Sequence, residues 1–218
     1  MPKIEPSLPT PTELDTDQNV RMALEAATLA NRALRAGSMA PAFRLRGHSG
    51  QQVSLQELIS TGPAIVHFNR GSWCTYCHDS MADLTVSYDN LRAAGARIVA
   101  IAPPPSARFL AAAQVEATHL PFPTLIDAGM KVAVAYGVTY SLPAQLRPIY
   151  LERGYTPPRN PRASEWLVPI PATYLIGTDC TIVLGAVDVD YRNPLHSEQL
   201  VTVVKGMRRA NASRSLRT

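Results

Sequence analysis

Two cysteines separated by two residues are the part of this chain best suited to chemistry. Cys74 and Cys77 follow a short apolar run, residues 64–68, and they precede apolar residues at helical spacing. A thiol in the first turn of a helix faces free N–H groups and the positive end of the helix dipole, which stabilise a thiolate. The i, i+3 spacing also places both sulfurs on one side of the helix, within reach of a disulfide. We therefore predict a reversible Cys74–Cys77 redox pair.

The surroundings of the two sulfurs are expected to differ. Cys74 is predicted to lie at an exposed tip behind Trp73, at the helix start where the dipole acts most strongly. Cys77 continues an apolar stripe formed by Met81, Leu84, Tyr88 and Leu91. Burial in apolar surroundings raises the pKa of a thiol. We expect Cys74 to be the more acidic and more exposed thiol and to attack first, with Cys77 resolving the product.

Other uses of the cysteines are weaker. A zinc site would need two further ligands, and no second C-x-x-C motif is present, so no metal is expected. Cys180 stands alone in a predicted turn and is not expected to join the disulfide. Two structural cysteines are the remaining alternative. Three cysteines, two of them close together, favour site chemistry in a reducing compartment, and we expect a cytoplasmic protein.

The pattern of elements around this motif predicts an α/β fold. Strands are expected at residues 64–68, 97–102, 122–127, 172–176 and 181–187, with helices between the first three and a hairpin at the end. We divide the chain into a leader and helix at 1–37, the main domain at 38–206 and a basic tail at 207–218. The leader helix is predicted from about residue 15 to residue 36. A last helix is predicted from Leu195 to Lys205, with Gly206 ending it. Residues 138–168, rich in proline and aromatic residues, are predicted to be an ordered insertion.

Composition excludes several protein classes. The chain has 218 residues, 46% hydrophobic and 17% charged, which suits one domain with a real core. The net charge of +4 comes from the C-terminal tail, so no nucleic-acid partner is expected. No apolar run is long enough for a membrane helix, and no secretory signal is visible.

These motifs together resemble the thioredoxin superfamily. A strand is followed by W-C-x-x-C at a helix start, and Ile170-Pro171 precedes a later strand. The stretches 68–77, 122–127 and 169–176 are similar to the peroxiredoxin-like, AhpC/TSA-type branch, and the likeness runs over about residues 38–205. The resemblance implies a thioredoxin-like fold with a central mixed sheet flanked by helices. It also implies a thiol-dependent antioxidant oxidoreductase that reduces a peroxide or disulfide without a cofactor, is reset by a thioredoxin- or glutathione-type reductant, and can form a homodimer.

The resemblance assigns a role to Pro171, and the motif itself places three further residues at the site. Pro171 would be a cis-proline beside the dithiol, presenting backbone to an extended substrate. Trp73 and Tyr76 would shape the rim of the site, and Arg70 would supply positive charge near the thiolate. These four residues, with the two cysteines, form the predicted site.

The two related families disagree on the attacking sulfur. Peroxiredoxins place Pro-x-x-x-Thr-x-x-Cys around the reactive cysteine, and an ungapped alignment from Phe68 puts that cysteine at Cys77. Arg70 and Cys74 then replace the proline and threonine. The thioredoxin alignment instead makes Cys74 the nucleophile. A general thiol–disulfide oxidoreductase with little peroxidase activity and a non-catalytic redox sensor remain alternatives.

Overall fold

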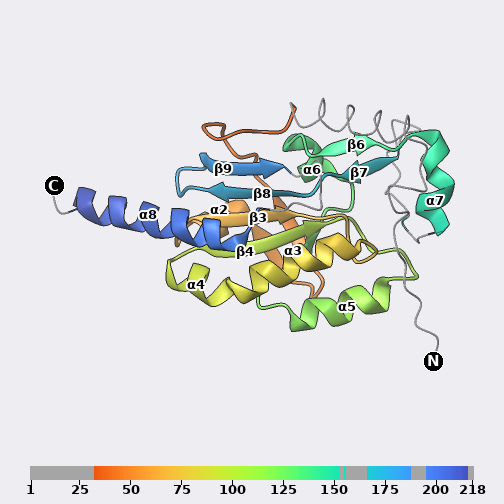
Figure 1. Ribbon diagram of the computed structural model, residues 1–218, viewed down its shortest axis with the longest axis horizontal. Helices are drawn as coiled ribbons and strands as arrows, with labels where there is room; N and C mark the ends of the chain where they lie inside the picture. Colours follow the sequence, from red (N-terminus) through yellow and green to blue (C-terminus); the bar gives the residue numbers. More distant parts are fainter. Residues whose placement is uncertain (1–31, 153–154, 156–165, 188–194, 216–218) are drawn as a thin grey trace.

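The apolar runs predicted as strands form the centre of a seven-stranded sheet. The structure is a computed structural model that describes residues 32–152, 155, 166–187 and 195–215 (Figure 1). The strands of this sheet are β1 (Arg44–Gly47), β2 (Gln52–Ser54), β3 (Ala64–Phe68), β4 (Arg97–Ala102), β5 (Thr124–Ile126), β8 (Ala172–Ile176) and β9 (Ile182–Val187). Their order across the sheet is β2-β1-β5-β4-β3-β8-β9.

Strand β3 is an interior strand of the sheet, and the motif follows its C-terminal end. It pairs in parallel with β4, with Ile65 opposite Ile98, and antiparallel with β8, with Phe68 opposite Ala172. All five residues of β3 are buried, as expected for a β-branched, apolar strand covered on both faces. The pairs β3–β4 and β4–β5 are parallel, whereas β1–β2, β1–β5 and the β8–β9 hairpin are antiparallel, which gives the predicted mixed sheet.

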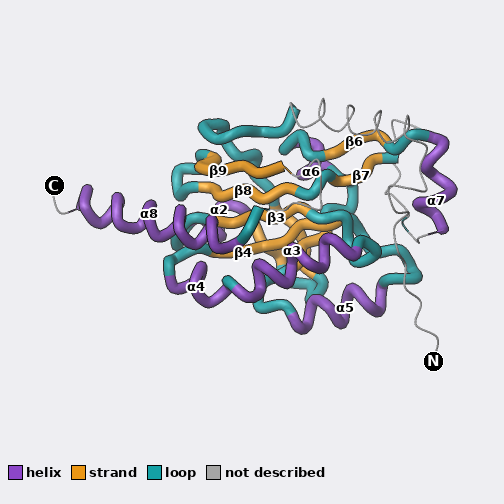
Figure 2. Tube along the Cα trace, in the orientation of Figure 1, coloured by secondary structure: helices purple, strands orange, loops and turns teal. Residues whose placement is uncertain are grey.

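Helices cover both faces of the sheet (Figures 1 and 2). One face packs against α2 (Leu55–Ile59) and α6 (Lys131–Ala135). The other packs against α3 (Thr75–Val86), α4 (Tyr88–Ala93) and α8 (Ser197–Ser215), with α5 (Leu110–His119) beside α3. The fold is therefore the thioredoxin-like arrangement expected from the sequence. Helix α3 begins after a short loop that follows the C-terminal end of β3.

The predicted insertion forms a small layer of its own. It contains β6 (Thr139–Ser141), a 3₁₀ turn at Ala144–Leu146, α7 (Arg147–Glu152) and β7 (Leu167–Pro169). β6 and β7 pair antiparallel as a separate two-stranded sheet. Figure 1 shows these elements together at one end of the molecule, beyond the carboxyl end of β3.

Two predictions at the chain ends were wrong. The leader helix does not extend to residue 36, because residues 32–37 form turns and irregular backbone; the part predicted at 15–31 lies outside the described residues. Helix α8 does not end at Gly206 but runs to Ser215, into the predicted tail. Leu200 and Val204 anchor its first half in the core, and the Arg208 guanidinium donates a hydrogen bond to the carbonyl of Ala93. These contacts outweigh the roughly 1 kcal/mol cost of an internal glycine.

Within the described ranges, no helix is both long and apolar enough to cross a membrane.

Candidate active site

A tight loop carries the chain from the end of β3 to the dithiol. Gly71 has a φ of +96°, a left-handed conformation that glycine adopts without strain. Its carbonyl accepts a hydrogen bond from the N–H of Cys74 over 3.1 Å. Cys74 is the N-cap residue of α3, and Cys77 lies in the first turn. Both cysteines therefore lie at a helix start, as predicted.

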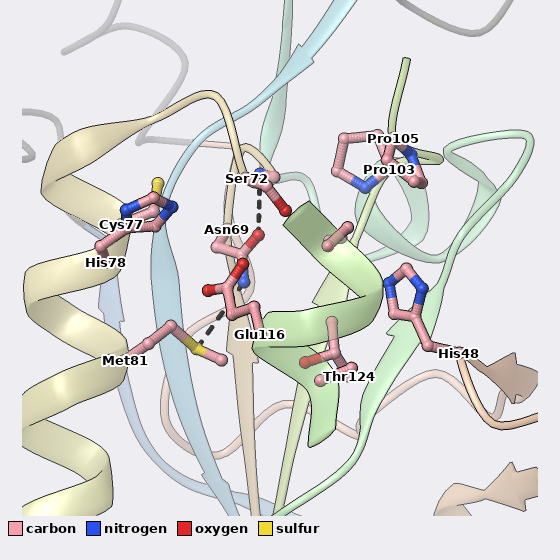
Figure 3. Close-up of a pocket in the computed structure, with 14 residues that line it drawn as sticks. His48, Asn69, Ser72, Cys77, His78, Met81, Pro103, Pro105, Glu116 and Thr124 are labelled. Carbon is pink, nitrogen blue, oxygen red and sulfur yellow. Dashed lines mark hydrogen bonds between the residues drawn. The ribbon is translucent and has the colours of Figure 1, made fainter. Parts of the chain in front are cut away.

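Asn69 holds this loop in place, and the sequence analysis did not single it out. Its side-chain oxygen accepts a hydrogen bond from the N–H of Gly71 over 2.8 Å, and its amide nitrogen lies 3.8 Å from the sulfur of Met81. Figure 3 shows both contacts, which join the end of β3 to the loop and to α3. An Asn two residues before a glycine in a tight turn is the sequence feature that could have identified it, because Asn side chains often bond the backbone two residues on.

The two sulfurs are in direct contact. Both thiols are free, and the Sγ of Cys77 donates to the Sγ of Cys74 over 2.6 Å. A disulfide bond is about 2.05 Å long, so a small movement would bring the sulfurs to bonding distance. The backbone N–H of Arg70 donates to the Sγ of Cys77 over 3.4 Å. The arrangement suits two-electron oxidation of the pair.

The surroundings separate the pKa values of the two thiols. The hydrogen bond from Cys77 lowers the pKa of Cys74 to about 7 despite burial, with help from the Arg70 charge and the N–H groups of Cys77 and Tyr76. Burial raises the pKa of Cys77, and the hydrogen bond to Cys74 and its charge raise it further. Cys74 is thus the more acidic sulfur, in the direction that the helix-start argument gives.

The predicted exposure of Cys74 was wrong. Its exposed fraction is 0%, against 4% for Cys77, so neither sulfur lies at an open tip. The insertion covers the dithiol with an apolar, aromatic cluster, which we call the aromatic cap. The cap comprises Trp73, Tyr140, Leu142, Leu146, Tyr150, Tyr155 and Val168. Because the insertion folds back over the helix start, spacing within the motif could not show this burial.

Ring contacts and phenol hydrogen bonds hold the aromatic cap together. The ring of Trp73 lies 5.0 Å from that of Tyr155 and 5.4 Å from that of Tyr150, centroid to centroid. The hydroxyl groups of Tyr140 and Tyr150 are 2.9 Å apart, and the Tyr155 hydroxyl donates to the carbonyl of Leu167. Trp73 therefore belongs to a packed cover above the sulfurs, while Tyr76 packs at its margin and is only partly buried.

Arg70 is a buried charge beside the dithiol. Only 7% of the residue is exposed, and its charge acts on both cysteines and on Tyr140 and Tyr150. It lowers the pKa values of the two thiols, and it opposes the effect of burial on Tyr140. A buried guanidinium beside a thiolate stabilises the anion far better than a solvated one would.

Pro171 lies at the expected end of the sheet, but its peptide bond is trans. Ala172 pairs with Phe68, the last residue of β3. Pro171 directly precedes Ala172, so it lies at the end of the sheet where the loop to the dithiol begins. No peptide bond in the described ranges is cis. The preceding segment is fixed by the pairing of β7 with β6 and by the hydrogen bond from Ile170 N–H to the carbonyl of Val138. The chain passes from β7 into β8 in the trans form, which X–Pro bonds favour by about 0.5–1 kcal/mol.

Cys180 lies at the opposite end of the sheet. It is in the turn after β8, and Ile176 pairs with Ala64 at the start of β3, whereas the dithiol follows the end of β3. The length of β3 separates the two positions by on the order of 15 Å. Cys180 has a φ of 64° and packs against the core on the α2 side of the sheet. No group of three or more His, Cys, Asp or Glu side chains that could hold a metal was found among the described residues.

The comparison with known proteins identifies the family. Residues 36–184 match the model of the AhpC/TSA family. This chain belongs to the AhpC/TSA family. Peroxiredoxin Q, chloroplastic, from Suaeda salsa is 32% identical to this family member over 106 residues, which are 49% of this chain and 48% of that protein. The chain thus spans about half the length of this curated relative.

Solved structures show the same fold for this AhpC/TSA family protein. Peroxidoxin BcpB from Mycobacterium tuberculosis has a TM-score of 0.60 at 20% identity, covering 79% of this chain and 97% of that one. Peroxiredoxin Q from Xanthomonas campestris has a TM-score of 0.57 at 17% identity, covering 79% and 99%. The reduced 2-Cys peroxiredoxin of Plasmodium vivax has a TM-score of 0.60 at 10% identity, covering 82% and 84%.

Proposed function

We propose that this protein is a thiol peroxidase that reduces a hydroperoxide through the Cys74/Cys77 dithiol. The observation that carries the proposal is the contact between two free sulfurs 2.6 Å apart, beside the buried charge of Arg70. A pKa of about 7 for Cys74 means that the pair holds a single proton in a large share of molecules at neutral pH. The thiolate, not the thiol, attacks a peroxide.

The chemistry takes place in two steps. A thiolate sulfur attacks one peroxide oxygen, the O–O bond breaks, and the leaving oxygen takes the proton that the pair still holds. The attacked sulfur is now a sulfenic acid. The other sulfur attacks it, the S–S bond forms and the S–O bond breaks, and the departing hydroxide takes a proton from solvent. One dithiol loses two electrons, and hydrogen peroxide becomes two waters.

Burial favours a small oxidant over a protein disulfide. A disulfide in another protein needs direct access to a sulfur and a backbone surface beside it, but Cys74 is fully buried under the aromatic cap. The resemblance implies a cis bond at Pro171 that presents backbone to an extended substrate, but the bond in this protein is trans. These features favour peroxide reduction over general thiol–disulfide exchange. A non-catalytic sensor would form the same disulfide but would stop after one oxidation.

An external thiol must return the dithiol to its reduced form. The proposed reductant is a thioredoxin- or glutathione-type thiol. One reductant thiolate attacks the Cys74–Cys77 disulfide and forms a mixed disulfide; a second reductant thiol attacks that bond, so the reductant leaves as its own disulfide and both site cysteines are thiols again. Because the aromatic cap covers Cys74, a small thiol reaches the pair more readily than a protein reductant does. No resident cofactor is needed for this electron balance. We further propose that the protein works in a reducing compartment such as the cytoplasm, where three free thiols persist, and that a homodimer is its candidate assembly.

Peroxide consumption with a thioredoxin or glutathione system tests this function. The wild type should consume many equivalents of hydrogen peroxide per chain, and Cys74→Ser and Cys77→Ser should each lose sustained turnover. Cys180→Ser is the matched control and should keep the wild-type rate. Oxidation that stops after one equivalent, with every reductant supplied, would support the sensor instead. Reduction of a protein disulfide without peroxide turnover would support the general oxidoreductase.

A further inference from the structure

The two sulfurs of the dithiol differ in how an external thiol can reach them. Cys74 packs within the aromatic cap, and no part of it is exposed. Cys77 contacts the cap as well, but it also lines a small pocket between α3, α5 and the end of β4. In Figure 3 His78 stands next to Cys77 on α3, and Glu116 of α5 lies across the pocket from them. Among the described residues that line this pocket, Cys77 is the one cysteine, so the pocket leads to one sulfur of the pair.

The pocket is narrow, and exposed groups stand in its wall. Its accessible volume is about 20 Å³. An accessible volume of about 10–15 Å³ holds one water molecule, so the pocket admits a group slightly larger than water, such as one thiol sulfur. His78 in its wall is exposed, and Glu116 and Ala117 are half-buried. A low-molecular-weight thiol can therefore bring its sulfur to Cys77 while the rest of the molecule stays outside, whereas the surface of a protein reductant cannot enter.

We propose that a low-molecular-weight thiol reduces the Cys74–Cys77 disulfide through this pocket, that it attacks the sulfur of Cys77, and that Cys74 is the sulfur that leaves. The proposal rests on one part of the proposed function, the alternation of the two cysteines between a dithiol and a disulfide. The order in which the sulfurs meet an oxidant does not enter, because either order gives the same disulfide. An exposed tip at Cys74 would have favoured attack on Cys74, and the aromatic cap closes that side.

The helix start stabilises Cys74 as the leaving sulfur. In the dithiol, the hydrogen bond from the Cys77 thiol is the largest cause of the lowered pKa of Cys74. The charge of Arg70 and the backbone N–H groups of Cys77 and Tyr76 also lower it, and these groups remain in place when the Cys77 sulfur carries the reductant. Burial raises the pKa of Cys77, which makes Cys77 the poorer leaving group. Because exchange depends on access and is faster when the leaving thiol has a lower pKa, both factors favour attack on Cys77.

The exchange is balanced over two steps. The thiolate of a first reductant molecule forms an S–S bond to Cys77, the Cys74–Cys77 bond breaks, and Cys74 leaves as a thiolate. A second reductant thiolate attacks the reductant's own sulfur in the mixed disulfide, and Cys77 leaves and takes a proton from solvent. Two small thiols lose two electrons and become one disulfide. The Cys77 thiol then donates to the Cys74 sulfur, which is the hydrogen bond that the structure shows.

Rapid-quench mapping of the wild type identifies the attacked sulfur. The disulfide is prepared with diamide, so the measurement does not depend on peroxide. The oxidised protein is mixed with excess 2-mercaptoethanol, quenched with acid, and unfolded in the presence of N-ethylmaleimide before mass mapping. We expect molecules that carry the 2-mercaptoethanol adduct on Cys77 and the maleimide on Cys74. The adduct on Cys74, with the maleimide on Cys77, would overturn the proposal, and if no adduct accumulates the rates of three variants decide.

The variants test the route of the reductant. Ala117 lines the pocket, whereas Ala112 is exposed on the same helix. Ala117→Leu should slow reduction of the disulfide by 2-mercaptoethanol by at least about tenfold, because it displaces the reductant sulfur from its productive position. Ala112→Leu is the matched control and should be reduced at the wild-type rate. Tyr155→Ala removes a ring of the aromatic cap and should not speed reduction; faster reduction in this variant would mean attack through the cap at Cys74.

The outcomes separate this proposal from the peroxidase function. If the protein turns over peroxide but the adduct lies on Cys74, or Ala117→Leu is reduced as fast as Ala112→Leu, the reductant route is wrong and the peroxidase function stands. If the diamide-made disulfide is reduced at Cys77 but peroxide is not consumed, the route stands and the peroxidase function falls. If neither oxidant links the two cysteines, both fall. The wild-type mapping and Tyr155→Ala decide the question even if Ala117→Leu does not fold.

Discussion

The backbone N–H of Arg70 donates to the sulfur of Cys77 over 3.4 Å, although seven residues separate them in the chain. One residue therefore serves the dithiol twice: its amide contacts one sulfur, and its buried side chain carries the positive charge that lowers the pKa values of both. The loop from β3 to α3 makes this possible, because Asn69 fixes its turn and Gly71 allows its left-handed conformation.

Removing the charge of Arg70 should weaken the thiolate. In Arg70→Met the pKa of Cys74 should rise, because the guanidinium lowers it in the folded protein. The rate of oxidation by hydrogen peroxide at pH 7 should fall several-fold, and part of the loss should return at pH 9, where the thiolate forms without help. Absorbance of the thiolate against pH measures the shift. Arg97→Met, an exposed arginine on β4, is the control, and an unchanged titration in Arg70→Met would contradict the assigned role.

The oxidation rate of the wild type should rise with pH through neutrality. Cys74 has a pKa of about 7, so the singly protonated pair becomes dominant as the pH increases from about 6 to about 8. Stopped-flow measurement of the rate with hydrogen peroxide over this range gives the apparent pKa. A rate that stays flat from pH 6 to 8, or rises only above pH 9, would show that the pair is not acidified.

Loss of the Asn69 side chain should loosen the loop. Asn69→Ala removes the acceptor for the Gly71 N–H and the contact with Met81, and the free energy of unfolding should fall by about 1–3 kcal/mol. The apparent pKa of the dithiol should rise as well, because the Arg70 amide loses its fixed place beside Cys77. Asn90→Ala on α4 is the control. Loss of stability without any change in the thiolate titration would limit Asn69 to a structural role.

The aromatic cap should control access of large reagents to Cys74. In Tyr155→Ala the ring that packs 5.0 Å from Trp73 is absent, so alkylation of Cys74 by a bulky iodoacetamide should become faster by about tenfold or more. The measurement is made on the Cys77→Ser background, so that only one site thiol reacts. Tyr88→Ala, which removes a ring packed on Phe122 away from the dithiol, should leave the rate unchanged. Equal rates in both variants would mean that the cap does not cover Cys74 in solution.

The sequence predicted those parts of the fold that depend on local pattern. The run at 64–68 and the C-x-x-C at a helix start are local signals, so β3, the start of α3 and the contact between Cys74 and Cys77 could be predicted. The burial of Cys74 could not, because it depends on Tyr150 and Tyr155, more than 70 positions along the chain. The end of α8 was missed for the same reason: Gly206 is a local stop signal, but the helix is held by contacts with α4.

In the site, too, local sequence predicted which residues take part, whereas the folded chain determines their surroundings. Arg70 was identified from its place in the motif, while its burial among Tyr140 and Tyr150 became visible only in the folded chain. The trans bond at Pro171 shows a further limit: sequence order placed the residue correctly, but the pairing of β6 with β7 decides how the chain enters β8.

The most direct test of the account is mass mapping of the reduced protein after reaction with one equivalent of hydrogen peroxide per chain. The account predicts that the peroxide is consumed, that a disulfide links Cys74 to Cys77, that Cys180 remains a free thiol, and that a dithiol reductant reverses the change. Peroxide left unconsumed, or a dominant bond from Cys180 to either site cysteine, would contradict it.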